Sequence, residues 1–303
     1  MKVPLLVWIP DFQSRRLPDM FPAEERRNLD SYRAQMAANA DRIILSSDDA
    51  VRDFAAFAPG AAFKARRLAF VAQVPAEVYR DDPAGVCGRY HLPERFVYLP
   101  NQFWKHKNHR LVVQALDLLK SEYPDAVIVC TGSTHEYRHP HYFAELLADI
   151  AGRGLRDRFI ILGLVPHADL YRLMRQSLAV LQPSLFEGWS TTVEEAKSVG
   201  KAILLSDLPV HREQDPPAAL YFDPHDPAAL AAGLAQVCRE RRPGPDLALE
   251  AAARAALPER TRAFADCFMN AVSLPGGPPC HPPPPPPAPG SSPAPRIVSG
   301  GRT

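Results

Sequence analysis

Between residues 95 and 205 the chain alternates short apolar segments with longer segments of helical spacing. An apolar run of four or five residues suits a buried strand, so the pattern predicts strands and helices in regular alternation. The expected strands are residues 96–99, 126–130, 159–162, 178–181 and 202–205. The expected helices are residues 109–121, 142–153, 168–175 and 192–199. This alternation indicates a doubly wound α/β sheet, whose ligands bind beyond the carboxyl ends of its parallel strands.

Residues 1–85 carry a shorter version of the same pattern. Apolar runs occur at 5–9, 42–45 and 68–74, and a polar segment of helical composition at 23–40 separates the first two. We therefore expect these residues to form the later part of a second parallel α/β sheet.

The C-terminal part is helical and then rich in proline. Residues 228–242 and 258–272 have helical spacing, whereas residues 274–303 contain six consecutive prolines after His281. This composition predicts a disordered or polyproline-like tail. The expected domains are a partial α/β domain at 1–85, a complete α/β domain at 90–245, a helical segment at 246–273 and the tail at 274–303.

The composition limits the class of partner. A chain of 303 residues, of which 46% are hydrophobic, can bury the cores of two domains. The 35 lysines and arginines nearly balance 34 acidic residues, so a net charge of +1 creates no general field for nucleic acid. No apolar run reaches the roughly 18 residues of a membrane span. We expect no nucleic-acid partner and at most peripheral contact with a membrane.

The cysteines bear on the compartment. Five are present, widely spaced and without a CxxC pair, at positions 87, 130, 238, 267 and 280. An odd and scattered set fits neither a disulfide framework nor a zinc site. The sequence therefore predicts a cytoplasmic protein, with any membrane contact at the inner membrane surface.

The segment 184–197 reads as a loop and a helix start directly after the expected strand at 178–181. The first turn of a helix has N–H groups without intrahelical partners and the positive end of the helix dipole, so residues 190–192 suit a phosphate group. Glu187 and Glu195 flank this turn. A sugar nucleotide has both phosphates, which suit the helix turn, and hydroxyls, which suit the two carboxylates.

This segment resembles the paired-glutamate signature of retaining family 4 glycosyltransferases. The usual signature is Glu-Gly-Phe-Gly, an aliphatic residue and proline, then Glu-Ala; here it reads Glu187-Gly188-Trp189-Ser190 and then Glu195-Ala196. Ser190 and Thr192 replace the second glycine and the proline, as in one subgroup of the family. The chain continues like that subgroup with Lys197, Gly200-Lys201, Ser206-Asp207 and Val210-His211-Arg212-Glu213-Gln214.

The resemblance covers about residues 97–227. It implies an α/β fold of the GT-B type, with one complete doubly wound Rossmann-like donor domain and an incomplete N-terminal Rossmann-like domain. The first strands and the glycine-rich loop of a GT-B acceptor domain have no counterpart here. We therefore expect either a start upstream of Met1 or a truncated descendant.

The resemblance also implies roles for the signature. Glu187 is expected to lie near the transferred sugar and to act in catalysis. Glu195 is expected to accept hydrogen bonds from the ribose hydroxyls, and bonds of this kind to a charged acceptor are strong. The neighbouring residues expected to bind the donor are Gly188, Trp189, Ser190, Thr191 and Thr192.

A second candidate segment, residues 100–109, follows the expected strand at 96–99. Lys107 stands where similar enzymes place a phosphate-binding lysine, and Gln102 stands where many relatives have arginine. The resemblance therefore assigns Lys107 a catalytic role, because a fixed cation stabilises a departing diphosphate, and it assigns Gln102 to donor binding. The alternative is that Lys105 and Lys107 are solvated loop charges.

Two glycine turns follow expected strands, at Gly132 and at Gly163. Glycine lets the backbone approach a ligand closely, and the resemblance places the nucleotide base against the second turn, which includes Val165. Ordinary turn chemistry explains either glycine equally well.

Nothing in the sequence indicates a resident metal or cofactor. His135, His139 and His141 lie close together, but their loop lacks the carboxylates or cysteines of a known metal site. No Asp-x-Asp occurs, as the resemblance to metal-independent GT-B enzymes implies. The expected ligand is the nucleoside diphosphate sugar alone, acting as the donor substrate.

The sequence thus predicts transfer of a hexose from a nucleoside diphosphate sugar to a hydroxyl acceptor, glycan or lipid-linked, with retention and in polysaccharide synthesis. A noncatalytic nucleotide-sugar-binding remnant is the first alternative. Gln102 favours it, and so does Ser14, which replaces a histidine that relatives commonly carry in the acceptor-side loop. A Rossmann dehydrogenase is the second alternative, although no G-x-G-x-x-G follows a strand.

Overall fold

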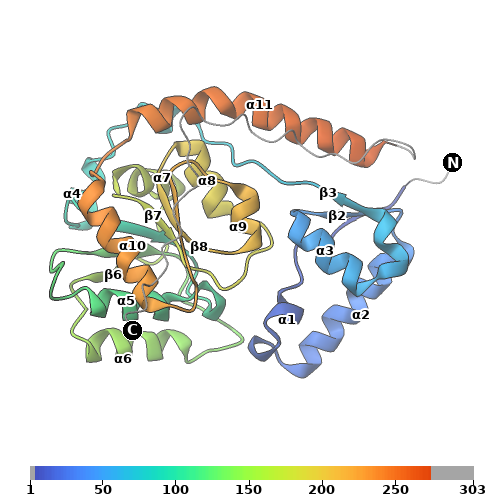
Figure 1. Cartoon of the computed structure of the whole chain (residues 1–303), viewed down its shortest axis with the longest axis horizontal. Coiled ribbons are helices and arrows are strands. Elements are labelled where there is room, and N and C mark those ends of the chain that lie inside the picture. Colours follow the sequence, from blue (N-terminus) through green and yellow to red (C-terminus); the bar gives the residue numbers. More distant parts are fainter. Residues whose placement is uncertain (1–3, 274–303) are drawn as a thin grey trace, which may run out of the picture. The chain divides into compact units, whose positions relative to one another are not determined.

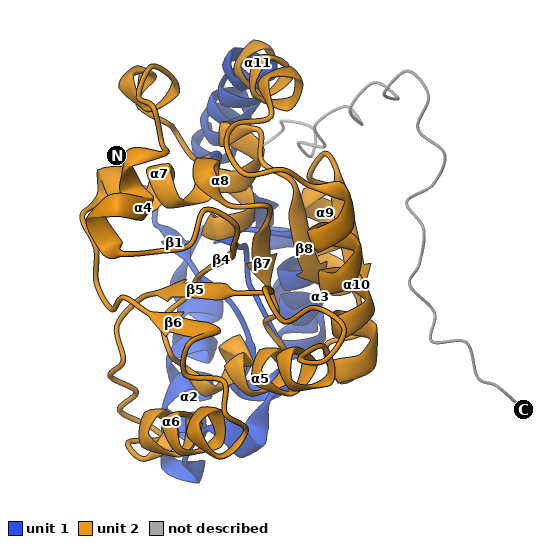
Figure 2. Cartoon of the chain, turned by 90° about the vertical axis from the view of Figure 1, so that its left-hand side faces the viewer, with its two compact units in different colours: residues 1–71, 186–190, 256–291 blue, residues 72–185, 191–255, 292–303 orange. Residues whose placement is uncertain are grey.

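The structure is a computed structural model that describes residues 4–273 (Figure 1). These residues form two compact units, coloured separately in Figure 2. The first unit contains residues 4–71, 186–190 and 256–273, and the second contains residues 72–185 and 191–255. The expected tail at 274–303 lies outside the described residues.

The second unit is built on a six-stranded parallel sheet in the order β6-β5-β4-β7-β8-β9. The strands are β4 (Val97–Pro100), β5 (Ile128–Thr131), β6 (Phe159–Ile161), β7 (Val180–Gln182), β8 (Ile203–Ser206) and β9 (Ala219–Phe222). The five expected strands are all present, and the α/β fold class is confirmed. β9 was not expected from the sequence.

Helices cover both faces of this sheet. Val97 and Leu99 belong to one buried cluster and Tyr98 to the other, as the alternating side chains of a strand require. The first cluster includes α5 (His109–Leu118), α6 (Tyr142–Gly152) and α10 (Pro227–Glu240). The second cluster includes α4 (Gly85–Tyr90), α7 (His167–Gln176) and α8 (Thr191–Val199), and α9 (Pro209–Gln214) packs beside α8.

The strand order reverses at β4. The chain runs from β4 to β5 and β6 on one side and then returns to β7 on the other side. Loops that leave β4 and β7 therefore diverge at the carboxyl edge of the sheet. In doubly wound sheets this reversal is the point where ligands bind.

The first unit has a three-stranded parallel sheet, β1 (Leu6–Trp8), β2 (Arg42–Leu45) and β3 (Ala65–Arg67), in that order. Its core joins Ile43 and Leu45 of β2 to Phe54. The helices within residues 4–71 are α1 (Gln13–Arg16), α2 (Ala23–Asn39) and α3 (Asp48–Phe57).

The third strand does not lie where the apolar run at 68–74 predicts it. β3 is the polar tripeptide just before that run, because pairing with β2 and the packing of Ala65 outweigh local hydrophobicity. The apolar run has another use, since Val74 packs into the buried cluster that contains Tyr98.

Helix α11 (Leu247–Val272) begins 11 residues before the expected start at Pro258, which lies inside it. Its first turns are held in the second unit. Gly200 adopts φ +77°, and a Cβ there would lie 2.5 Å from the carbonyl oxygen of Leu249. A buried ion pair of 2.9 Å joins Arg175 to Glu250 of the helix. These contacts explain how a helix can start upstream of a proline that removes one of its hydrogen bonds.

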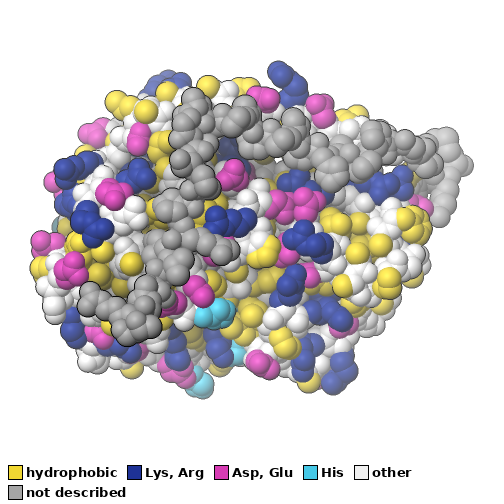
Figure 3. Space-filling model, in the orientation of Figure 1, with side chains coloured by type: hydrophobic (Ala, Val, Ile, Leu, Met, Phe, Trp, Pro, Cys, Tyr) yellow, Lys and Arg dark blue, Asp and Glu magenta, His cyan; other side chains and the backbone are white. Residues whose placement is uncertain are grey.

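On the face drawn in Figure 3, basic and acidic side chains are interspersed, and neither sign forms a large patch. This distribution agrees with the net charge of +1. Among the described residues, no helix has both the length and the apolar character needed to cross a membrane.

Candidate functional site

The candidate site begins at the carboxyl ends of β4 and β7, where the strand order reverses. Asn101 follows β4 directly and its side-chain amide donates to Gln182 Oε1 at 2.6 Å, with both residues buried. This bond joins the carboxyl ends of β4 and β7, which lead into the candidate segments 100–109 and 184–197. The reversal point therefore has a fixed geometry in the second unit.

Gln102 and Gly132 tie the loop after β4 to the turn after β5. The side-chain oxygen of Gln102 accepts from the backbone N–H of Ser133 at 2.6 Å. Gly132 has φ +142°, and a Cβ there would lie 2.3 Å from the carbonyl oxygen of Asn101. Only glycine fits this contact. Both residues thus have structural partners, and their roles in donor binding stay predictions.

The turn after β6 belongs to the same edge. Gly163 has φ +70°, and its carbonyl oxygen accepts from the N–H of Gly132 at 2.9 Å. Nothing lies within 4 Å of a Cβ at Gly163, so its left-handed backbone conformation alone accounts for the glycine. Val165 is partly buried and packs against the cluster of α7 and α8.

Lys107 lies in the single 3-10 turn Lys105–Lys107 before α5. The carbonyl oxygen of His106 accepts from the N–H of Leu185 at 2.8 Å. The Asn108 amide donates to the Pro183 carbonyl oxygen at 3.2 Å. The lysine loop is therefore held against the residues that follow β7 and lead into the glutamate signature.

Helix α8 begins at Thr191, one residue before the expected start. Thr192 is buried, and its hydroxyl donates to the carbonyl oxygen of Pro100, at the end of β4, at 3.4 Å. The first turn of α8 therefore lies at the reversal point. Ser190 is buried, whereas Thr191 is exposed.

Glu195 lies in the middle of α8. It is partly buried, and this burial raises its pKa to about 7. Burial is the only cause, because no cation or hydrogen-bond donor of the described residues offsets the loss of water. Its charge also helps to raise the pKa of Tyr171 to about 12, after the larger effect of that phenol's own burial. Such a group is a candidate ligand contact.

The adjacent Glu194 has a different environment. It is 1% exposed, and it accepts from the Gln214 amide at 3.1 Å and pairs with Lys197 at 3.5 Å. Glu194 therefore joins α8 to α9 inside the second unit. Sequence reasoning missed this role, although the (i, i+3) spacing of Glu194 and Lys197 was a usable signal.

The subgroup residues Gly200 and Lys201 also have structural roles. Lys201 is buried, and its ammonium group donates to the carbonyl oxygens of Gly244 at 2.8 Å and Arg175 at 3.1 Å. Burial lowers the pKa of Lys201 to about 7, mainly through lost hydration. These residues hold the region where α11 begins and do not contribute to the reversal point.

Residues 186–190, which include Glu187, belong to the first unit. A Cβ on Gly188 would lie 2.5 Å from the carbonyl oxygen of Pro10 and 2.8 Å from Asp11 Cβ. The indole N–H of Trp189 donates to the carbonyl oxygen of Phe70 at 2.9 Å. Gly188 and Trp189 therefore contact protein in the first unit, and their expected role in donor binding stays a prediction.

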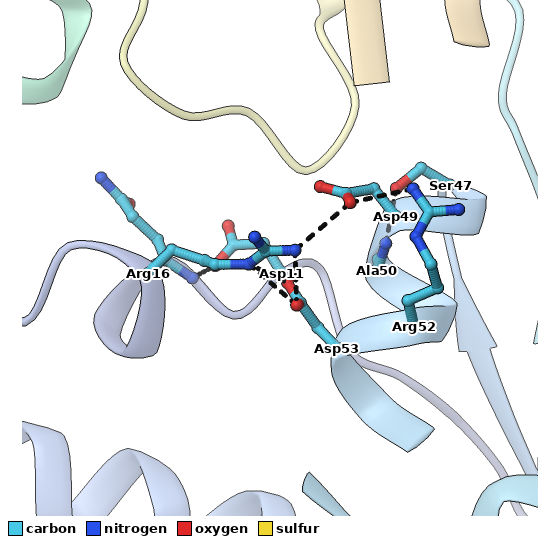
Figure 4. Close-up of polar contacts among 8 residues, drawn as sticks. Asp11, Arg16, Ser47, Asp49, Ala50, Arg52 and Asp53 are labelled. Atoms are coloured by element: carbon cyan, nitrogen blue, oxygen red, sulfur yellow. Dashed lines mark hydrogen bonds and ion pairs between the residues drawn. The ribbon is translucent and has the colours of Figure 1, made fainter. Parts of the chain in front are cut away.

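The loop after β1 is held by charged side chains (Figure 4). Arg16 donates to Asp53 at 2.8 Å and to Asp49 at 3.3 Å, and so joins α1 to α3. Asp11 Oδ1 accepts from the N–H of Gln13 at 2.9 Å. The loop after β1 is thus held against α3.

Ser14, in the place of the histidine of relatives, is 2% exposed. Its hydroxyl accepts from Arg33 at 2.8 Å. The side chain is thus engaged inside the first unit.

Metal ligands do not gather in the described part of the chain. Within residues 4–273, no group of three or more His, Cys, Asp or Glu side chains could hold a metal ion. His135 is exposed, and His139 is partly buried.

Comparisons with known proteins bear on the family and the fold of the chain. The model of the family "Glycosyl transferases group 1" matches residues 91–256, more than half of the chain. O-antigen chain mannosyltransferase B of Escherichia coli is 32% identical over 135 residues, which are 43% of this chain and 33% of that protein. O-antigen chain mannosyltransferase RfbU of Salmonella typhimurium is 28% identical over 123 residues, 41% of this chain and 33% of that protein. The chain thus spans about a third of the length of these relatives.

Solved structures show the same fold at low identity. Anabaena Alr3699/HepE, solved in complex with UDP and glucose, matches with a TM-score of 0.67 and 17% identity, over 88% of this chain and 71% of that one. A glycosyltransferase from Rickettsia africae matches with a TM-score of 0.66 and 16% identity, over 88% of this chain and 69% of that one.

Proposed function

Because the chain belongs to the family of group 1 glycosyl transferases, we propose that it transfers a hexose from a nucleoside diphosphate sugar to a hydroxyl acceptor. We propose further that the reaction retains the anomeric configuration and needs no divalent metal. The observation that carries this proposal is Glu195, a partly buried carboxyl group with a raised pKa in the middle of α8.

Two ribose hydroxyls would supply the donors that Glu195 lacks among residues 4–273. Hydrogen bonds to a charged acceptor are short and strong, and they would compensate for the water that burial removes. The nucleoside therefore lies over the reversal point, and its base is held by the turn that contains Gly163. Backbone groups at this turn favour the base without a charged side chain.

The diphosphate lies at the first turn of α8. Thr192 anchors this turn to the end of β4, so the helix dipole and its N–H groups are already aimed when the donor arrives. Lys107 adds a fixed positive charge. Together they stabilise the negative charge that grows on the diphosphate as the bond to the sugar breaks.

In the transfer step the acceptor oxygen bonds to the anomeric carbon while the bond from that carbon to the diphosphate oxygen breaks. The acceptor proton passes to the departing diphosphate. Attack from the face that the leaving group vacates gives retention and needs no protein nucleophile, and Glu187 orients the sugar. The O-antigen relatives favour a glycan or lipid-linked acceptor, and we propose that the protein acts in the cytoplasm, at most peripherally at the inner membrane surface.

One observation favours a second candidate, a nucleotide-sugar-binding protein without transferase activity. Ser14, which replaces the histidine of relatives, is 2% exposed and bonded to Arg33. It offers no side chain to a sugar. The donor-side residues would be retained in this case and turnover would be absent.

Calorimetric titration tests the proposal. We expect UDP-glucose or GDP-mannose to bind with equal affinity in EDTA and in Mg²⁺, and Glu195→Gln to weaken binding. The exposed Glu122, replaced by glutamine, is the matched control. Binding that strictly requires Mg²⁺ would reject metal independence, and no binding of either donor would reject the function. Binding without sugar transfer would select the second candidate.

A further inference from the structure

We infer that Trp189 is a positioning residue, which holds the catalytic segment of Glu187 by binding the backbone of Phe70. This inference rests on the proposed function. It assigns to Trp189 a role other than the donor contact that its place in the signature predicts.

The indole N–H makes the central contact. Trp189 is partly buried, and its Nε1 donates to the carbonyl oxygen of Phe70 at 2.9 Å. Phe70 lies three residues after β3, in the same unit as residues 186–190. Phenylalanine, the usual residue at this position of the signature, has no N–H and cannot form this bond.

The indole ring is fixed from two more directions. The Phe70 ring meets it edge-on, with centroids 6.4 Å apart and planes at 73°. The guanidinium carbon of Arg67 lies 5.7 Å from the indole centroid, within the range of a cation–π contact. Arg67 also pairs with Asp48 at 3.5 Å, which limits its own movement. Two residues that follow one another closely in the chain thus enclose the ring.

Gly188 makes a second close contact of the same segment. The space that a side chain would need is occupied by the backbone of Pro10 and by Asp11. The next residue, Phe12, is 1% exposed, and Arg16 bonds this loop to α3 (Figure 4). The segment therefore fits against this loop only without a Cβ at residue 188.

These contacts limit the movement of Glu187, because the two residues that follow it are both held. A carboxylate that orients a reacting sugar must keep its position closely, and a shift of about 1 Å can lower a rate by roughly 100-fold. Loss of the hydrogen bond from Trp189 to Phe70 should therefore reduce turnover and leave donor affinity nearly unchanged. Donor affinity depends on Glu195, Lys107 and α8, which belong to the second unit.

The test compares Trp189→Phe with Trp8→Phe. Trp8 is a matched control, because it also lies in the first unit and donates its indole N–H to a single partner, Ser46 Oγ, at 3.1 Å. We expect Trp189→Phe to lower kcat about fivefold to tenfold, as loss of one hydrogen bond allows, with the donor KM within about twofold of wild type. We expect Trp8→Phe to change neither.

Hydrogen exchange gives a second measurement that does not need turnover. The backbone amides of residues 186–190 should exchange faster in Trp189→Phe than in wild type. Their exchange rates in Trp8→Phe should equal those of wild type. Melting temperatures would show that both variants are folded. Faster exchange confined to Trp189→Phe supports the positioning role of Trp189, and equal exchange in the two variants overturns it.

Gly188→Ala is the stronger perturbation, and Gly60→Ala is its control because nothing lies within 4 Å of a Cβ at Gly60. We expect Gly188→Ala to lower kcat by about 100-fold with an unchanged donor Kd.

A kcat for Trp189→Phe equal to that of Trp8→Phe, in a chain that transfers sugar, overturns the inference alone. A wild-type chain that binds no sugar nucleotide overturns the proposed function instead, and Trp8→Phe would share that failure.

Discussion

The carboxyl edge of the six-stranded sheet and the segment 186–190 are held in different ways. At the sheet edge, main-chain bonds join the loops to one another, from Gly132 to Gly163 and from Leu185 to His106. In the segment 186–190, the indole of Trp189 and the close backbone contact at Gly188 help to hold the chain. The loops at the sheet edge are thus joined by main-chain bonds and by the side chains of Asn101 and Gln102, whereas the position of the segment depends on the side chain of Trp189.

The largest effect should come from breaking the main-chain contact at the sheet edge. Gly132→Ala places a Cβ 2.3 Å from the Asn101 carbonyl oxygen at a positive φ, so the free energy of unfolding should fall by about 3 kcal/mol. Urea denaturation measures this change. Gly152→Ala, where a Cβ meets nothing within 4 Å, should have no such cost. Equal stability of the two variants would show that the edge rearranges freely.

Substitution of the side chains proposed to contact the donor should change donor binding or turnover. Lys107→Ala and Glu195→Ala should each weaken donor binding by about 1.5 to 3 kcal/mol, the size of a hydrogen bond to a charged group. Glu187→Ala should reduce kcat more than donor affinity. Calorimetry and initial rates separate these effects. Unchanged donor affinity in the first two variants would place both residues outside the site.

Glu195 should make the stability of the protein depend on pH. Burial raises the pKa of Glu195 to about 7, whereas an exposed glutamate titrates near about 4.3. The folded chain then holds a proton that the unfolded chain releases, so its stability falls as pH rises from about 4 to about 7.

Glu195→Gln removes this loss. The variant should match wild type at pH 4 and exceed its free energy of unfolding by about 1 to 2 kcal/mol at pH 8. Glu194→Gln should instead destabilise the protein at pH 8, because Glu194 pairs with Lys197. Denaturation at the two pH values decides this, and a Glu195→Gln variant no more stable than wild type at pH 8 would contradict the raised pKa.

The smallest effect should come from deleting residues 274–303. This segment contains six consecutive prolines and no periodic apolar face, so removing it should leave the melting temperature and donor binding unchanged. Thermal denaturation measures the first and calorimetry the second. A decrease of several degrees would show that the tail packs on the rest of the chain.

The sheet of the second unit could be predicted because its signals are local. Short apolar runs and helical spacing placed β4 to β8 and α5 to α8, and the strand before the signature placed the loop after β7. The polar β3 and the early start of α11 could not be predicted in this way. Their positions depend on Ile43 and Ile44 of β2 and on the contact of Gly200 with Leu249, which are distant in sequence.

For the site, the sequence by itself determined the paired glutamates, the lysine loop and their order along a doubly wound sheet, because each of these is written in consecutive residues. Only the tertiary structure distinguished the buried and paired Glu194 from the raised pKa of Glu195. It alone brought Phe70 to the indole of Trp189, 119 residues away in the chain. Burial and long-range hydrogen bonds arise from residues that become neighbours on folding, and no local pattern encodes them.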